Sequence, residues 1–212
     1  MTGRRLGIMG GTFDPIHYGH LLAAEESLCA LQLDEVVFIP TGLPPHKRSF
    51  HVSSAEHRFT MTLLAVLENP RFSVSRVEID RDGSSHTVDT LREFRRRAAR
   101  EEEYFFITGL DAVLDIASWK EYSVLPLFCR IVAVSRPGYG RSGIDLLPSE
   151  IRRAIIPLEI PLLSISSTDI RKRVEQGKNI RYLTPEPVVQ YISKTDLYSG
   201  SLDSHDGGQR QG

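Results

Sequence analysis

The chain has 212 residues, of which 41% are hydrophobic and 25% are charged, as is ordinary for a soluble globular protein with one sizeable α/β domain. Its 26 basic and 27 acidic side chains leave a formal net charge of -1, which argues against nucleic acid as the main partner, because nucleic-acid-binding proteins usually carry a basic excess. No apolar run approaches the roughly 18 residues that a membrane span requires. We therefore expect a cytoplasmic protein with no nucleic-acid or membrane partner.

The first predicted element is a short apolar strand at residues 6–9, and apolar residues at helical spacing predict a helix over about 21–31. Between them lies the stretch Gly10-Gly11-Thr12-Phe13-Asp14-Pro15-Ile16-His17-Tyr18-Gly19-His20. Glycines let a backbone approach an anion closely, and the start of a helix offers unpaired N–H groups and the positive end of a dipole. The sequence therefore predicts a phosphate-binding turn between this strand and this helix.

Strand and helix signals alternate along the rest of the chain. Strands are predicted at 35–40, 72–79, 104–108, 131–134 and 158–160, and helices at about 53–69, 87–100, 109–118, 166–175 and 187–194. Ser53 or Ser54 is expected to cap the first of these helices, with Glu56 placed for a capping box. The alternation predicts an α/β fold with an open, doubly wound parallel sheet, which binds its ligands at the carboxyl ends of the strands.

We expect a single domain over residues 1–198, whose last helices form a small C-terminal helical part. Residues 199–212 are rich in Gly, Ser and Asp, and we expect this tail to be disordered. The arginines at 95–97 and 100 could form a nucleic-acid patch. The simpler interpretation is that these cations answer the dipole at the C-terminus of a helix.

The two histidines of the predicted turn, His17 and His20, lie three residues apart at the start of a helix, so both side chains can project to one side. Such a pair could bind a metal, act as acid and base, or donate to phosphate oxygens. A catalytic metal site would need a third protein ligand, and no Glu or His stands at a convincing offset. We therefore expect phosphate donors, and no metal-ligand set formed by the protein.

Two stretches resemble the signatures of the nucleotidyltransferase superfamily, which implies a Rossmann-like fold. Residues 10–20 resemble the T/HxGH motif, and Ile165-Ser166-Ser167-Thr168-Asp169-Ile170-Arg171 resembles the ISSTxxR motif. Further segments narrow the resemblance to the nicotinate mononucleotide adenylyltransferases: Pro44-Pro45-His46-Lys47, Ala55-Glu56-His57-Arg58, Thr87-Val88-Asp89-Thr90-Leu91, Ser118-Trp119-Lys120, Arg136-Pro137-Gly138-Tyr139 and Arg181-Tyr182-Leu183. The resemblance covers residues 5–198. Two departures are His86, where the family commonly has tyrosine, and Leu110, where a smaller residue is usual.

The resemblance implies transfer of the adenylyl group of ATP to nicotinate mononucleotide, giving nicotinate adenine dinucleotide and pyrophosphate in the route to NAD. The acceptor's phosphate would attack the α-phosphorus in line, without a covalent intermediate. The implied catalytic residues are His17, His20, Lys47 and Arg171, of which the last would hold the leaving pyrophosphate. The implied ATP-binding residues are Gly10, Gly11, Thr12, Phe13, Asp111, Ile165, Ser166, Ser167 and Thr168.

For the acceptor, the resemblance implies contacts from His46, from Thr87 at a helix start and from Trp119, which would stack on the nicotinate ring. Mg²⁺ would be bound through the ATP phosphates. Alternatives that stay open are a nicotinamide mononucleotide or dual-specificity enzyme, a phosphopantetheine adenylyltransferase, and a nucleotide-binding regulator without catalysis. A homo-oligomer also stays open.

Overall fold

A computed structural model describes residues 3–43, 52–98, 101–137 and 143–199. Its strands are β1 (Arg4–Gly11), β2 (Glu35–Pro40), β3 (Phe72–Val74), β4 (Glu102–Gly109), β5 (Cys129–Ser135) and β6 (Ile155–Glu159). Its α-helices are α1 (Tyr18–Ala30), α2 (Ala55–Val66), α3 (Thr87–Arg97), α4 (Leu110–Leu114), α5 (Ser149–Ala154), α6 (Ser167–Glu175) and α7 (Glu186–Lys194). Short 3₁₀ turns lie at Ile116–Ser118, Tyr122–Leu127 and Ile144–Leu146.

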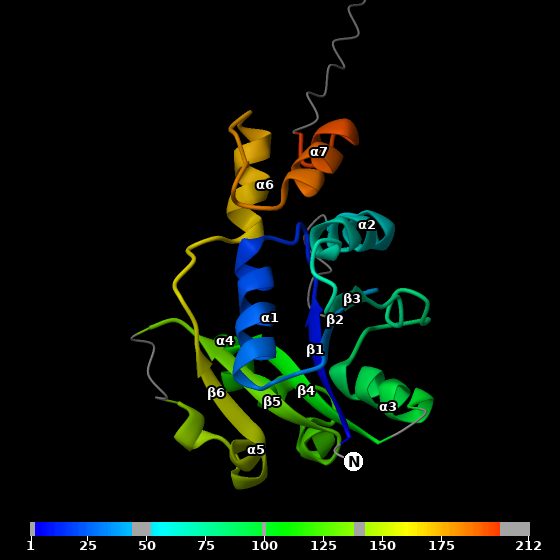
Figure 1. Cartoon of the computed structure of the whole chain (residues 1–212), viewed down its shortest axis with the longest axis vertical. Coiled ribbons are helices and arrows are strands. Elements are labelled where there is room, and N and C mark those ends of the chain that lie inside the picture. The colour runs from blue at the N-terminus through cyan, green and yellow to red at the C-terminus, as the bar shows by residue number, and fades with distance from the viewer. Residues whose placement is uncertain (1–2, 44–51, 99–100, 138–142, 200–212) are drawn as a thin grey trace, which may run out of the picture.

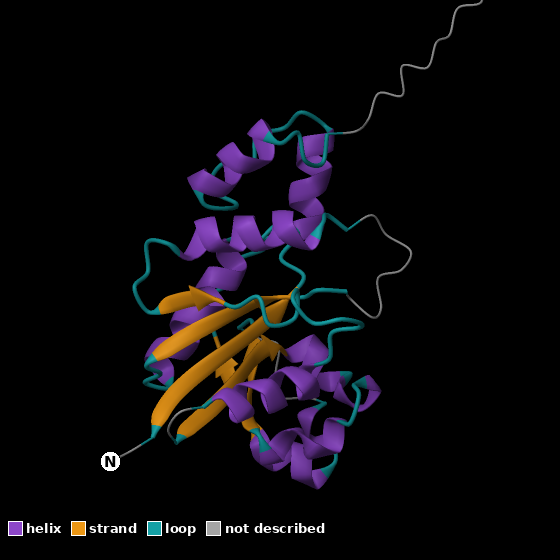
Figure 2. Ribbon diagram, turned by 90° about the vertical axis from the view of Figure 1, so that its right-hand side faces the viewer, coloured by secondary structure: helices purple, strands orange, loops and turns teal. Residues whose placement is uncertain are grey.

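The strands form one six-stranded sheet in the order β3-β2-β1-β4-β5-β6, and every pair of neighbours is parallel. Parallel neighbours need long crossover connections, which the helices supply, so helices lie on both sides of the sheet (Figures 1 and 2). This arrangement confirms the prediction of a doubly wound, Rossmann-like α/β fold.

The alternation of side chains along the strands divides the core into two layers. On β1, Leu6 and Ile8 belong to a layer covered by α3, α4 and α5, whereas Met9 belongs to a layer covered by α1, α2, α6 and α7. On β2, Val37 and Val36 divide in the same way. Both faces of the sheet are therefore apolar, which explains why its strands read as continuous hydrophobic runs.

The sheet has its topological switch point between β1 and β4. The chain leaves β1 for β2 and β3 on one side and then crosses to β4 on the other side, in the register Ile8 beside Phe106. The connections that leave these two strands diverge to opposite directions, which opens a crevice at their carboxyl ends. The predicted turn at residues 10–20 starts at this crevice, and α6 and α7 extend beyond it (Figure 1).

The structure confirms the type of each predicted element, helix or strand, but several of the predicted bounds were wrong. The strand predicted at 72–79 ends at Val74, the one at 158–160 is Ile155–Glu159, and the helix expected to end near Asn69 ends at Val66. Helix α5 was not predicted.

The predicted capping box of α2 was wrong. Ser54, rather than Ser53, caps this helix and accepts a hydrogen bond from the His57 N–H over 3.3 Å. Glu56 therefore stands one position too early to close the box, and it pairs with Arg76 at 2.7 Å instead.

In the described ranges no helix is both long and apolar enough to cross a bilayer. The predicted tail lies outside the described residues, except for Ser199.

Candidate active site

Two clefts open at the switch point, on either side of the carboxyl end of β1. The larger, of about 390 Å³, is lined by residues from the start of α1, from the ends of β4 and β5 and from the segment before α6. The smaller, of about 260 Å³, is lined by the Gly10–Thr12 turn and by residues from around α3. Thr108 of β4 lines both clefts. Two separate ligands could thus meet beside this residue.

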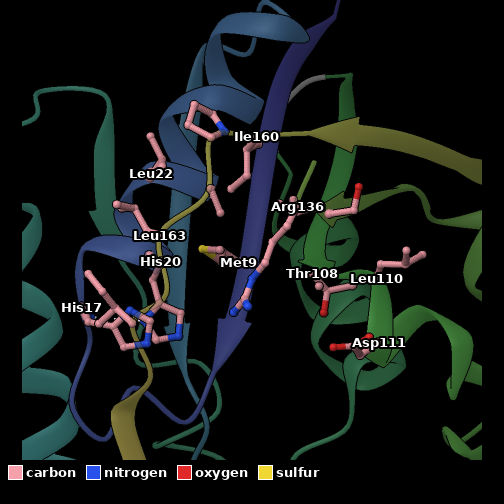
Figure 3. Close-up of a pocket in the computed structure, with 17 residues that line it drawn as sticks. Met9, His17, His20, Leu22, Thr108, Leu110, Asp111, Arg136, Ile160 and Leu163 are labelled. Atoms are coloured by element: carbon pink, nitrogen blue, oxygen red, sulfur yellow. Dashed lines mark hydrogen bonds between the residues drawn. The ribbon is translucent and has the colours of Figure 1, made fainter. Parts of the chain in front are cut away.

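The larger cleft holds ionisable side chains on opposite walls. His17 and His20 stand on one wall, and Asp111 stands opposite on the first turn of α4 (Figure 3). The guanidinium of Arg136, which follows β5, projects into the space between them (Figure 3). Asp111 and Arg136 are both exposed, and neither side chain has a hydrogen-bond partner among the described residues. Both are therefore available to a ligand.

The two histidines form a stacked pair. Their ring centroids lie 3.8 Å apart at an interplanar angle of 26°, and the His17 N–H donates to Nδ1 of His20 over 3.2 Å. Burial lowers the pKa of His17 to about 4, and burial followed by the charge of His17 lowers the pKa of His20 well below its ordinary value. At neutral pH both rings are therefore uncharged.

The hydrogen bonding fixes the tautomer of His20. Because Nδ1 accepts the His17 N–H, the proton of the neutral His20 ring must lie on Nε2. His20 lines the larger cleft, so it can present this N–H to an anion. His20 can thus act as a neutral hydrogen-bond donor in the free protein, and the role of the pair as phosphate donors stays a prediction.

The turn before the histidines is tightly packed. A Cβ added at Gly11 would lie 2.7 Å from the Phe13 ring, so a larger residue would displace that ring. Phe13 is only 2% exposed, has a left-handed backbone with φ of 51°, and packs edge-on against His20 at 5.1 Å. Its side chain belongs to the core, so only its backbone could contact ATP.

The second predicted motif contacts the first across a separation of 152 residues. Ser167, the first residue of α6, donates its hydroxyl to the Pro15 carbonyl over 2.8 Å, and Nη1 of Arg171 donates to the Asp14 carbonyl over 2.7 Å. Ser166 caps the helix by accepting the N–H of Asp169 over 3.1 Å. The start of α6 is therefore fixed beside the turn.

The other residues that were predicted to contact ATP do not all lie at the larger cleft. Ile165 lines the larger cleft and is half-buried, whereas Thr168 is exposed and accepts Nη2 of Arg171 at 3.4 Å. Gly10, Gly11 and Thr12 line the smaller cleft rather than the larger one.

The smaller cleft contains both described residues that were predicted to bind the acceptor. Thr87 opens α3, where its N–H is not committed to the helix ladder, and Trp119 forms part of the wall. Trp119 is half-buried and packs edge-on against Phe106 at 5.8 Å, so it serves both the core and the cleft. His46 and Lys47 lie outside the described residues.

Two residues that line the clefts, Arg136 and Glu78, were given no role in the sequence predictions. Arg136 has two signals: it belongs to the segment Arg136-Pro137-Gly138-Tyr139 that carries the family resemblance, and it lies directly after a strand, where the ligands of a parallel sheet bind. Glu78 lines the smaller cleft, is only 7% exposed, and accepts the Thr90 hydroxyl over 2.6 Å. Burial raises the pKa of Glu78. Glu78 lies beside the cleft because the chain turns after Val74, whereas the sequence pattern predicted a strand that continues to residue 79.

The departures from the family pattern have definite positions. Leu110 is buried in the core and also lines the larger cleft, and His86 is the residue that precedes α3. Within the described ranges, no group of three or more His, Cys, Asp or Glu side chains is placed to hold a metal ion.

A parallel sheet with a glycine turn and a histidine pair at its switch point, and a late helix fixed to that turn, is the arrangement expected of a nucleotidyltransferase, and the comparisons with known proteins show that class. The sequence profile of the Cytidylyltransferase-like family matches residues 8–173. The chain is 51% identical over 203 residues to the "Probable nicotinate-nucleotide adenylyltransferase" of Moorella thermoacetica, covering 94% of each chain. It is 50% identical over 198 residues to the protein of the same name from Thermoanaerobacter sp., covering 92% of this chain and 94% of the other. The chain belongs to the nicotinate-nucleotide adenylyltransferase family.

The fold is also found in a solved structure, the Plasmodium falciparum nicotinic acid mononucleotide adenylyltransferase complexed with NaAD. The TM-score is 0.72 at 21% identity, and the alignment covers 92% of this chain and 97% of that one. At this identity the similarity establishes the shared fold.

Proposed function

We propose that this protein transfers the adenylyl group of ATP to nicotinate mononucleotide and releases pyrophosphate. The observation that carries the proposal is the meeting of two clefts at Thr108, with the stacked His17 and His20 on the opposite wall of the larger cleft. A transfer between two nucleotides requires two adjoining sites with phosphate donors at their junction. Relatives that are 51% and 50% identical to this chain are named for this activity.

In this proposal ATP occupies the larger cleft. Asp111 accepts hydrogen bonds from the ribose hydroxyls, and Arg136 balances the charge of the phosphates. His17 and His20 donate to oxygens of the α-phosphate and its neighbour. At the start of α6, the N–H groups and hydroxyls near Ser167 and Thr168 complete the cradle for the leaving group.

The acceptor occupies the smaller cleft, with its ring on Trp119 and its carboxylate at the start of α3. An N-terminal helix dipole favours a carboxylate and offers less to a neutral amide, which supports the acid as substrate. His46 and Lys47 stay in the proposal on the strength of the family resemblance, with Lys47 reaching the phosphates from the side opposite to the histidines.

The chemical step needs no covalent enzyme intermediate. An oxygen of the acceptor's 5′-phosphate attacks the α-phosphorus, the bond from that phosphorus to the α,β-bridging oxygen breaks, and pyrophosphate leaves with the electron pair. The residues accelerate the step by alignment and by donating hydrogen bonds where negative charge accumulates. Arg171 would hold the pyrophosphate with a forked pair of donors, although in the free protein one of its nitrogens is bonded to the Asp14 carbonyl.

A divalent cation, which we propose to be Mg²⁺, would neutralise phosphate charge and be bound mainly by the nucleotide. We further propose one catalytic unit over residues 1–198 that acts in the cytoplasm, and we leave a homo-oligomer open.

The test is pyrophosphate release with ATP and Mg²⁺ and each of three acceptors: nicotinate mononucleotide, nicotinamide mononucleotide and phosphopantetheine. We expect turnover with the first and a much lower kcat/KM with the second. Turnover that prefers nicotinamide mononucleotide would contradict the acid preference. Binding of ATP without turnover on any acceptor would instead support a non-catalytic nucleotide-binding regulator.

A further inference from the structure

Arg58 of α2 is the largest side chain among those that are almost fully buried, with 1% of its surface exposed. It donates three hydrogen bonds, all to backbone carbonyls: Nε to Ser53 over 2.9 Å, Nη1 to Thr12 over 3.0 Å, and Nη2 to Gly42 over 3.0 Å. These carbonyls belong to the start of α2, to the phosphate-binding turn and to the segment after β2. One guanidinium thus joins three parts of the chain.

This arrangement is energetically demanding, because a buried guanidinium is strongly destabilising unless its donors are satisfied. The nearest compensating charge is the buried carboxylate of Asp14, which accepts the Ser53 N–H over 3.2 Å and the Tyr198 hydroxyl over 2.6 Å. Burial lowers the pKa of Arg58, and the charge of Asp14 opposes that shift. An apolar side chain could fill the same space without this cost but could not orient a peptide group.

The peptide that Arg58 orients is the one between Thr12 and Phe13. In a trans peptide the carbonyl and the next N–H point in opposite directions. The Thr12 carbonyl faces Arg58, so the Phe13 N–H points away from it. Among the described residues, no atom accepts a hydrogen bond from the Phe13 N–H. The left-handed backbone of Phe13, with φ of 51°, is of the kind that turns successive N–H groups toward an anion.

We propose that Arg58 is a positioning residue for the transferred phosphate: by holding the Thr12 carbonyl, it aims the Phe13 N–H at the phosphate oxygens. The proposal rests on the adenylyl-transfer activity given above. It adds a residue that touches neither substrate, lies outside both clefts, and acts only through the backbone of the turn.

The test compares Arg58→Lys and Arg58→Ala with Arg76→Ala as a matched control. Lysine keeps the charge but cannot reach three carbonyls at once. Arg76 is partly exposed and forms ion pairs with Glu56 and Asp80, away from both clefts. Per folded molecule, we expect both Arg58 variants to lose about 10²-fold in kcat, the usual effect of losing one such donor. The KM values should change far less, and Arg76→Ala should match the wild type.

Chemical rescue separates positioning from packing. Guanidinium at millimolar concentration should restore part of kcat in Arg58→Ala and none in Arg58→Lys, where the lysine side chain still occupies the site. A purely structural role predicts that kcat per folded molecule is unchanged in Arg58→Lys. That result would overturn the proposal.

A readout that needs no turnover is the ¹⁵N–¹H signal of Phe13 in the labelled protein, titrated with ATP. We expect a large shift in the wild type and a much smaller one in Arg58→Lys. A wild-type Phe13 signal that ATP leaves in place would overturn the proposal even if no Arg58 variant folds. Absence of wild-type turnover with a normal Phe13 shift would instead contradict the proposed function and leave the role of Arg58 standing.

Discussion

The hydroxyl of Ser167 donates a hydrogen bond to the carbonyl of Pro15, 152 residues earlier in the chain, over 2.8 Å. The bond fixes the first turn of α6 against the segment that leads into α1. Arg171 strengthens this link through the Asp14 carbonyl. The two signature motifs are therefore held together as one structural unit, although they lie far apart in the sequence.

Ser167→Ala tests this link. Loss of one partly buried hydrogen bond should lower the free energy of unfolding by about 1 kcal/mol and should lower kcat more than tenfold, because α6 loses its fixed place. Ser27→Ala is the control, since the Ser27 hydroxyl donates to Ala23 over 2.7 Å within α1. Urea denaturation and initial rates measure both. Equal kcat values in the two variants would show that the link is not needed for turnover.

His20→Ala should abolish most activity while the protein stays folded. The variant removes the Nε2 donor, and removal of one such donor typically costs about 10²–10³-fold in kcat. His20→Asn offers a side-chain amide in place of the ring and should recover part of the loss. The measurement is kcat together with the melting temperature. A folded His20→Ala protein with wild-type kcat would show that the histidine pair is structural.

Trp119→Ala should raise KM for nicotinate mononucleotide more than KM for ATP, because Trp119 lines only the smaller cleft. Trp119→Phe keeps an aromatic face and should stay closer to the wild type. Some loss of stability is expected from Trp119→Ala, since the indole packs on Phe106. Equal increases in both KM values would contradict the assignment of the acceptor to this cleft.

Arg136→Ala should raise KM for ATP about tenfold or more, by removing a charge-assisted contact, with little change for the acceptor. Because the side chain is exposed and has no partner in the described ranges, the free energy of unfolding should change by less than about 0.5 kcal/mol. Arg130→Ala is the control, because Arg130 lies on β5, the strand that Arg136 follows, at the end far from the clefts. Equal effects of the two variants on ATP would remove Arg136 from the site.

The pH dependence of stability should carry the signature of the histidine pair. Burial lowers the pKa of His17 to about 4, whereas an unfolded histidine titrates near 6.5. Between these values the unfolded chain binds a proton that the folded chain does not, so the free energy of unfolding should fall as pH falls from about 6.5 toward 4.

For His17 alone this loss is at most about 3 kcal/mol. Urea denaturation of the wild type and of His17→Gln at pH 7 and pH 5 measures it. The variant should lose less stability over this interval than the wild type. The same pH dependence in both proteins would show that His17 is not the group that titrates.

The sequence predicted the sheet well because the information was local. Residues 36–39 are apolar on both faces of a buried strand, and the helix beginning at Thr87 was placed at the right residue. The predictions were wrong where tertiary contacts override a local pattern. Residues 75–79 alternate like a strand, yet the chain turns away after Val74, because Glu78 and the backbone near it pack against Gly42.

For the site, the structure brings the two motif histidines to the larger cleft and Thr87 and Trp119 to the smaller one, and their roles there stay predictions. The motifs could not indicate that Phe13 is a core residue or that Arg58 holds three carbonyls. Those facts depend on which segments pack together, and no spacing within the chain records them.

Thr108 lines both clefts, and this has a consequence for the product. If the substrates bind as proposed, a dinucleotide formed across that residue would occupy both clefts as one molecule, so each half would hold the other at a high effective concentration. The product should therefore dissociate more slowly than either substrate, and its escape, rather than the bond exchange at phosphorus, should limit steady-state turnover.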